Sequence, residues 1–288
     1  MGLFDIFKKR TSNLPQSPKV TPTVREKPIG WDAIAAQEGK ARRAEFVKDA
    51  AGLYPYEVLL LTYAEKYTAG KEIARFWLYD FGIDDVPGML RSLEKRGFLS
   101  DGKPTEAGLQ EIEKNEYIFY MRRNKDIGIP LSRMNQLAVA YPNRPYRDLI
   151  WGEYNEQYYE AVKTLNFSKM GSIRCEMAKF SLKEGRPNDA IVLLAEAAYY
   201  SLNSCHSTLP EYYYKILSDA GKRTAKTNDE LEQLIMCRLC DLGAKIQVYS
   251  PIAVTKIVLA CVNGQTEKVA YLFEVKTVRI SGKPIELF

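Results

Sequence analysis

Apolar residues recur at the three- and four-residue spacing of amphipathic helices through most of the chain after residue 30. The pattern predicts a helix over residues 31–50, a buried helix that begins at Val58–Leu61, and a third helix with Phe76 and Trp77 on its apolar face. The second half of the chain continues with helix after helix, including one over about residues 229–242. The hydrophobic pattern therefore predicts a mainly α fold.

One helix of the first half carries signals at both of its ends. Asp85 stands directly before Val86-Pro87, and a short acidic side chain followed by proline is typical of a helix N-terminus. The helix is expected to stop at Gly97, because glycine accepts the left-handed conformation in which many helices end. Phe98-Leu99 then predicts a short strand.

A turn and another helix are expected after this strand. Gly102 marks the turn, and Thr105 is the N-cap candidate of the helix. A capping box would place Glu or Gln at position 108, but Gly108 stands there, so Thr105 must cap the helix alone.

The order of helix, "EKRGFL", turn and "PTEAGLQEIEKN" resembles winged-helix modules, in which a recognition helix leads into a strand and a return element. It also looks like the SAP-type helix–extended loop–helix module, through Leu90, Leu93, Arg96, Gly97, Phe98 and Leu99. Both families mostly bind DNA, so the resemblance implies a small DNA-binding domain in this part of the chain.

The second half is similar to tetratricopeptide repeats, in which small residues allow close helix crossing after a short turn. The junction Gly185-Arg186-Pro187, followed by Ala190 and Ala197, carries this rhythm. A solenoid needs about three repeats, so a non-repetitive helical bundle remains an alternative. The whole arrangement resembles uncharacterised proteins of Gram-positive bacteria and their phages, with Tyr141–Asp148 at the join. That resemblance implies no particular activity.

Both ends of the chain depart from the helical pattern. Residues 11–30 hold four prolines and few large apolar residues, which predicts an extended linker that tethers residues 1–10. Ile252–Leu259 and Val269–Val278 are rich in β-branched residues and predict strands of a small terminal hairpin or tail. We therefore expect a flexible N-terminal peptide and linker over residues 1–30, a winged-helix or SAP-like domain over residues 31–125, and a helical domain over residues 126–288.

Composition limits the classes of partner. Hydrophobic residues make up 46% and charged residues 27%, which is typical of a globular chain. The apolar stretches break within about 10 residues, whereas a membrane span needs about 20, so we expect no transmembrane helix. The net charge of +5 is uneven, because residues 51–130 carry 11 Lys and Arg against 13 Asp and Glu. This balance weighs against avid nucleic-acid binding by the small domain.

The five cysteines are expected to be reduced thiols in the cytoplasm. The chain begins with apolar residues followed by basic ones, the reverse of a secretory signal. Cys205, His206, Cys237 and Cys240 have the composition of a structural zinc site. The Cys-x-x-Cys pair lies in an apolar helical run, however, so we interpret its cysteines as small core residues and expect no metal. Whether the four residues meet in space is left open.

Recognisable catalytic motifs are missing from the sequence. His206 is the sole histidine, so a Ser-His-Asp or Cys-His-Asn arrangement would depend on it, and no nucleophile elbow is present. No glycine-rich phosphate loop of the Walker or dinucleotide-binding type occurs either. We therefore expect no enzymatic activity and no cofactor, with an enzyme of unrecognised site as a minor alternative.

Two groups of side chains are candidates for binding. Basic residues on and after the expected recognition helix could contact phosphates, unless they form a solvated face balanced by nearby glutamates. The chain also holds 19 tyrosines, which suit protein interfaces but also pack in cores. The candidate nucleic-acid-binding residues are Arg91, Lys95, Arg96, Lys103, Arg122 and Arg123, and the candidate protein-binding residues are Tyr199, Tyr200, Tyr212 and Tyr213.

The leading hypothesis is a non-catalytic adaptor or regulator whose small domain binds nucleic acid weakly while the helical array holds a protein partner. The alternative is a protein-interaction scaffold that binds no nucleic acid. The order of elements favours the first hypothesis, and the acidic balance of residues 51–130 favours the second. The sequence does not predict an oligomeric state.

Overall fold

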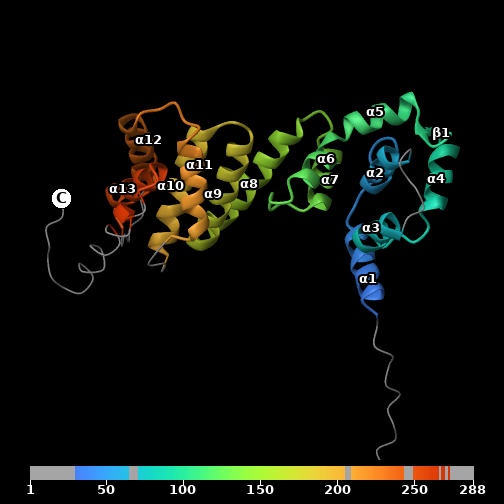
Figure 1. Ribbon diagram of the computed structural model, residues 1–288, viewed down its shortest axis with the longest axis horizontal. Coiled ribbons are helices and arrows are strands. Elements are labelled where there is room, and N and C mark those ends of the chain that lie inside the picture. Colours follow the sequence, from blue (N-terminus) through green and yellow to red (C-terminus); the bar gives the residue numbers. More distant parts are fainter. Residues whose placement is uncertain are drawn as a thin grey trace, which may run out of the picture. The chain divides into compact units, whose positions relative to one another are not determined.

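The computed structural model describes residues 30–64, 71–204, 209–242, 249–265, 267–269 and 272 (Figure 1). These residues form a mainly helical fold with one two-stranded sheet, so the expected fold class is confirmed. The N-terminal peptide and almost all of the linker lie outside the described residues. The elements are α1 (Trp31–Ala44), α2 (Pro55–Tyr63), α3 (Lys71–Phe81), α4 (Val86–Lys95), β1 (Leu99–Ser100), β2 (Lys103–Pro104), α5 (Glu106–Lys114), α6 (Glu116–Arg123), α7 (Leu131–Ala140), α8 (Tyr146–Lys163), α9 (Phe167–Lys183), α10 (Pro187–Asn203), α11 (Glu211–Gly221), α12 (Asn228–Asp241) and α13 (Pro251–Val262).

The chain divides into two compact units. One unit takes α1 and α3, and the other takes residues 44–67 and everything from Pro87 onward. In the first unit α1 and α3 meet at two glycines: a Cβ added to Gly39 would lie 2.4 Å from the amide nitrogen of Gly82. Only a residue without a side chain permits this approach.

The first helix is shorter than the predicted 31–50. It ends at Ala44, and the amide of Val47 donates to Oδ1 of Asn135 at 2.7 Å instead of continuing the helix. Phe46 is buried in the core of the second unit. This part of the prediction was wrong because a distant side chain takes the backbone amide that a helix would use.

The predicted helix end at Gly97 and the turn at Gly102 are confirmed, and the short strand expected at Phe98-Leu99 lies one residue later, at Leu99–Ser100. α4 begins directly after Asp85 and ends in a Schellman motif, in which Gly97 has φ +80° and the amide of Phe98 donates to the carbonyl of Leu93 at 3.0 Å. β1 and β2 pair antiparallel across Asp101 and Gly102, both with positive φ as a tight two-residue turn requires.

Thr105 caps α5 as expected, with its hydroxyl oxygen accepting the amide of Gly108 at 3.2 Å. The structure also explains why glycine stands at position 108. A Cβ there would lie 2.3 Å from the carbonyl oxygen of Phe98, so close packing of α5 on the hairpin excludes the glutamate of a capping box.

Helices α8 to α13 form a helical array around α10 (Figure 1). α10 contacts α9, α11, α12 and α13, and most of its residues are buried. α9 and α10 form a hairpin whose turn contains Gly185 with φ +73°. A Cβ added at Gly171 would lie 3.2 Å from the carbonyl oxygen of Ala197, so glycine at this position lets the two helices approach closely.

The predicted terminal strands are corrected at Ile252–Leu259, which lies within α13. Ser250 caps this helix by accepting the amide of Ala253 at 3.2 Å, and Pro251 occupies its first turn. Burial of Val254, Ile257 and Val258 against neighbouring helices outweighs their β propensity. Most of Val269–Val278 lies outside the described residues.

Within the described part of the chain, none of the helices combines the length and the apolar character that a bilayer crossing requires.

Candidate functional site

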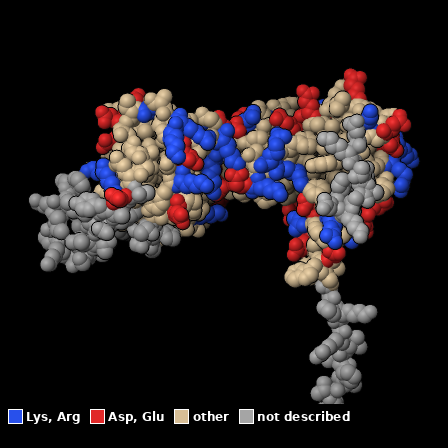
Figure 2. Space-filling view, viewed as in Figure 1, with Lys and Arg blue, Asp and Glu red and all other residues tan. Residues whose placement is uncertain are grey.

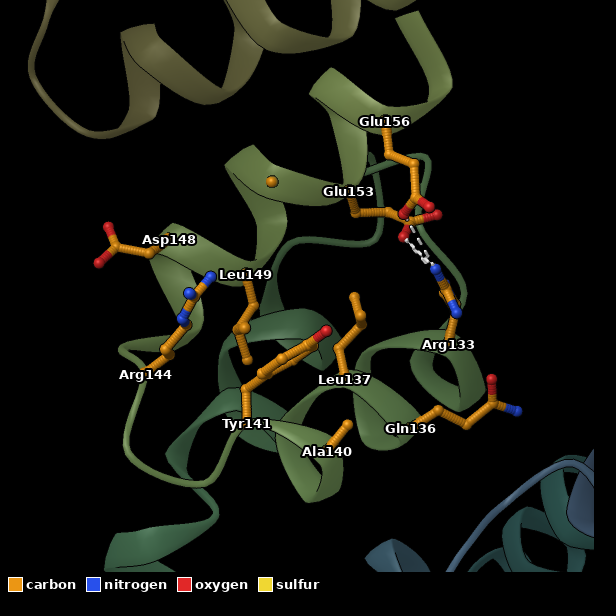
Figure 3. Close-up of a pocket in the computed structure, with 11 residues that line it drawn as sticks. Arg133, Gln136, Leu137, Ala140, Tyr141, Arg144, Asp148, Leu149, Glu153 and Glu156 are labelled. Atoms are coloured by element: carbon orange, nitrogen blue, oxygen red, sulfur yellow. Dashed lines mark hydrogen bonds and ion pairs between the residues drawn. The ribbon is translucent and has the colours of Figure 1, made fainter. Parts of the chain in front are cut away.

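A cleft of about 430 Å³ opens between α7 and α8, at the segment that joins them (Figure 3). Its apolar floor consists of Leu137 and Ala140 from α7 and Leu149 from α8. Gly152 lies exposed on the α8 wall, where an added Cβ would meet no atom within 4 Å. The missing side chain at Gly152 therefore keeps this part of the cleft open.

Charged side chains fill one end of the cleft. Nε of Arg133 donates to Oε2 of Glu153 at 2.9 Å, and its Nη2 lies 3.3 Å from Oε2 of Glu156. The hydrogen bond that Arg133 donates to Glu153 raises the pKa of Arg133 above its ordinary value. The other oxygen of Glu153 accepts Nε2 of Gln157 at 2.9 Å. The buried Glu153 carboxylate is thus fixed, whereas Glu156 is exposed and can turn toward a ligand.

The opposite end carries an aromatic ring and two charges. Tyr141 ends α7 with its ring half exposed, and the guanidinium of Arg144 lies 5.2 Å from the centre of that ring. Asp148 stands in the first turn of α8, whose N-cap residue is Pro145. Figure 3 shows Tyr141 and Leu149 facing the middle of the cleft and Asp148 pointing away from it.

Polar contacts with Tyr117 and Glu45 hold α7, one wall of the cleft, in position. Nδ2 of Asn135 donates to the hydroxyl of Tyr117 at 3.2 Å, and the Ser132 hydroxyl donates to Glu45 at 2.6 Å. Nε2 of Gln136, whose side chain lines the cleft, donates to the carbonyl of Glu45 at 3.1 Å. The cleft thus has an apolar floor between two charged ends, and these contacts hold its α7 wall in position. Such a cleft suits a short peptide with an apolar residue between polar ones.

The candidate nucleic-acid-binding residues are not brought together in one cluster. Arg91 and Lys95 are exposed on α4, and Lys103 is exposed on β2. Arg96 has a different role: Nη1 lies 2.9 Å from Oε1 of Glu57, and Nη2 donates to the carbonyl of Gly52 at 2.9 Å. Its guanidinium therefore ties α4 to the start of α2, which argues against the predicted phosphate contact.

Arg122 and Arg123 lie in the last turn of α6, next to the end of α9. Lys183 of α9 donates to Oδ1 of Asn124 at 3.1 Å and also pairs with Asp126. Figure 2 shows Lys and Arg side chains gathered over α8, α9 and α11 and again over α6 and α7, with carboxylates between them.

Several basic residues at this junction are paired with carboxylates. Nε of Arg147 lies 2.5 Å from Glu184, and Lys179 lies 2.6 Å from Glu176. Arg186 lies 3.4 Å from Asp189 and 5.0 Å from the centre of the Trp151 ring. A phosphate would have to compete with these carboxylates, which weakens the case for avid nucleic-acid binding here.

Three of the four candidate protein-binding tyrosines are core residues. Tyr199, Tyr200 and Tyr213 are buried, and the hydroxyl of Tyr200 lies 2.7 Å from that of Tyr158. Tyr212 alone is exposed, with Lys179 Nζ 5.4 Å from the centre of its ring. The protein-binding prediction therefore remains for Tyr212 only.

Cys237 and Cys240 are exposed on α12, so their interpretation as core residues was wrong. The buried stripe of α12 runs through Leu231, Ile235 and Leu239 at four-residue spacing, and both cysteines fall beside it. Cys205 and His206 lie outside the described residues. Among the residues that the structure describes, no group of His, Cys, Asp and Glu side chains could hold a metal ion.

A buried ionic cluster was missed by the sequence analysis. Oε2 of Glu196 on α10 lies 2.9 Å from Nε of Arg174 on α9, and its Oε1 accepts Nε of Arg238 on α12 at 2.6 Å. The guanidinium of Arg174 also lies 3.7 Å from the centre of the Tyr158 ring. The sequence signal for this cluster was one glutamate inside the apolar run from Ala190 to Ala198.

No protein-family model, curated protein or solved structure matches the chain.

Proposed function

We propose that the chain is a non-catalytic adaptor that binds a short segment of a protein partner in the cleft between α7 and α8. The observation that carries the proposal is the open cleft itself, with an apolar floor and the Arg133–Glu153–Glu156 cluster at one end. The partner segment places an apolar side chain over Leu137 and Leu149 and a basic side chain near Glu156.

The test uses a substitution that fills the cleft. Gly152→Trp adds a large ring where nothing blocks it, and Gln110→Trp on the exposed face of α5 is the matched control. Peptides are selected from a random library on the full-length protein, and a fluorescein-labelled selected peptide is titrated by anisotropy. We expect Gly152→Trp to weaken binding at least about tenfold and Gln110→Trp to leave it unchanged. Equal affinity of both variants, or no selected peptide at all, would contradict the proposal.

A second candidate function is weak DNA binding through α4 and the following hairpin. It is favoured by the exposed Arg91 and Lys95 on the helix that leads into β1 and β2, the order of elements found in winged-helix modules. It ranks second because the other basic cluster, at the α6–α9 junction, is largely paired with carboxylates.

The DNA hypothesis is tested by anisotropy of the intact protein with random duplex and single-stranded DNA at about 50 and 200 mM salt. We expect salt-sensitive binding that the double substitution Arg91→Ala and Lys95→Ala weakens for all sequences, with a shallower salt dependence. Arg122→Ala with Arg123→Ala is the comparison at the other basic site. Absence of binding at the lower salt concentration would contradict the DNA-binding hypothesis.

A further inference from the structure

The first ten residues of the chain join an apolar half to a basic half. Four large apolar side chains fall within five positions, and three basic side chains follow directly. The apolar residues are Leu3, Phe4, Ile6 and Phe7, and the basic ones are Lys8, Lys9 and Arg10. Asp5 is the one acidic residue among the ten, so their side chains carry a net charge of +2. We call residues 1–10 the N-terminal segment.

The charged residues that line the cleft between α7 and α8 leave one negative charge unbalanced. Nη2 of Arg133 lies 2.8 Å from Oε2 of Glu153 and 3.3 Å from Oε2 of Glu156, so two carboxylates share one guanidinium (Figure 3). The side chain of Glu156 is 66% exposed. At the opposite end, Arg144 and Asp148 contribute one charge of each sign. A basic side chain can therefore approach Glu156 while Arg133 stays bound to Glu153.

The apolar floor of the cleft lies beside this acidic end. Leu137 and Leu149 form the floor, and the open position at Gly152 leaves room above it. The volume of about 430 Å³ is within the range of pockets that bury apolar side chains of a ligand. A segment with aromatic residues next to basic ones matches this order of floor and charge, because consecutive residues of an extended chain are about 3.3 Å apart.

The linker is long enough to bring the N-terminal segment to the cleft. α1 has 14 residues and is therefore about 21 Å long. Glu45 follows α1 directly and accepts hydrogen bonds from Ser132 and Gln136 of α7. Chain connectivity alone thus keeps the start of α1 within roughly 35 Å of Gln136, whichever way α1 points. A linker of the length of residues 11–30 spans about 25 Å as a coil and about 60 Å when extended.

We propose that the N-terminal segment occupies the cleft between α7 and α8 of its own chain and competes there with the partner peptide. Its apolar side chains cover Leu137 and Leu149, and its basic residues lie toward Glu156. The inference rests on the proposed function, because it takes the cleft as a peptide-binding site. Tethering gives the segment an effective concentration in the millimolar range, so even a weak contact fills the cleft until a partner displaces it.

Photo-cross-linking of the full-length protein tests this placement. p-Benzoylphenylalanine is incorporated in place of Phe4, and the cross-linked peptides are identified by mass spectrometry in a mixture with an isotope-labelled copy. We expect cross-links within one molecule to residues 131–163, which hold α7 and α8. Gly152→Trp should lower their yield at least about tenfold, and Gln110→Trp should leave it unchanged. Cross-links only to the labelled copy, none to residues 131–163, as for a segment that binds only membranes, or a yield insensitive to Gly152→Trp overturns the proposal.

Binding of the library-selected peptide separates this inference from the proposed function. Phe4→Asp with Phe7→Asp removes the tethered competitor, so the peptide should bind this full-length variant at least about tenfold more tightly than the wild type. Leu14→Asp with Val20→Asp makes the same charge change in the linker and should leave the affinity unchanged. Equal affinity for the Phe4 and Phe7 variant and the wild type, with Gly152→Trp still weakening the peptide, overturns this inference alone. A peptide insensitive to Gly152→Trp contradicts the proposed function instead, and the cross-links then decide the place of the N-terminal segment.

Discussion

Nε of Arg174 lies 2.9 Å from Oε2 of Glu196, with both side chains buried inside the helical array. The second oxygen of the same carboxylate accepts Nε of Arg238 at 2.6 Å. One glutamate therefore joins α9, α10 and α12 through two arginines. We expect this cluster to favour the observed arrangement of the three helices, because separating Glu196 from Arg174 would leave a charge buried without its counter-ion.

Glu196→Gln is expected to lower the free energy of unfolding by about 3–5 kcal/mol, since it leaves the buried Arg174 without a counter-ion. Urea denaturation followed by circular dichroism measures the change. The matched control is Glu160→Gln, whose partner Lys163 is exposed, with an expected loss below about 1 kcal/mol. Similar losses in the two variants would show that the cluster does not stabilise the array.

Gly185→Leu is expected to destabilise the array by about 1–2 kcal/mol, because leucine must then adopt the left-handed conformation with φ near +73°. Thermal unfolding measures the shift in Tm. Gly152→Leu places the same side chain at an open helical position and should not lower Tm. A Tm of Gly185→Leu equal to that of the wild type would mean that the turn relaxes around the new residue.

Arg96→Ala is expected to lower the stability of the fold, whereas Arg91→Ala is expected to leave it nearly unchanged. Loss of the Arg96 contacts to Glu57 and Gly52 should lower the free energy of unfolding by about 1–2 kcal/mol. Arg91→Ala changes an exposed side chain and should stay within about 0.5 kcal/mol of the wild type. Urea titrations of both variants give the comparison, and equal stability would remove the structural role of Arg96.

Thiol reactivity is expected to divide the described cysteines into two classes. Burial raises the pKa of Cys175 and of Cys261 to about 12, whereas Cys237 and Cys240 are exposed. In a Cys205→Ser background at pH 8, Ellman's reagent should modify two thiols rapidly and the other two only when the chain unfolds. Rapid modification of all four would contradict the burial of Cys175 and Cys261.

The same two thiols predict lower stability at alkaline pH. A thiol whose pKa is raised by folding stabilises the native state below the unfolded value near 9, and that contribution is lost as pH rises from about 9 toward 12. The loss is about 1.4 kcal/mol per thiol at pH 10. Cys175→Ala with Cys261→Ala should flatten the decline in urea midpoints between pH 8 and 10, and an unchanged slope would assign the decline to other groups.

Local sequence signals predicted the elements that local interactions determine. Asp85, Gly97 and Thr105 marked helix ends correctly because capping involves residues only a few positions apart. The β-branched run of α13 was assigned to a strand because its helical state depends on packing against distant helices.

For the site residues, too, the local sequence did not predict contacts between residues that are distant in the chain. Arg91 and Arg96 have similar sequence surroundings, yet only Arg96 reaches Glu57, 39 positions away. The cleft was not predicted, because its walls depend on how α7 and α8 meet, although Tyr141–Asp148 was recognised as a junction. Glu196 could have been noticed as a charge in an apolar helix, but its two arginine partners lie 22 and 42 positions away and have no local signal.

The composition of the unit formed by α1 and α3 determines where the chain can be truncated without dividing a folded unit. Residues 44–67, which include α2, lie between these two helices in the sequence but belong to the other unit. A fragment beginning after Ala44 would keep α3 but lose α1, whose Gly39 packs closely against Gly82. Expression boundaries chosen from a linear domain map would therefore leave an orphaned helix, whereas deletion of α1 and α3 together removes a complete unit.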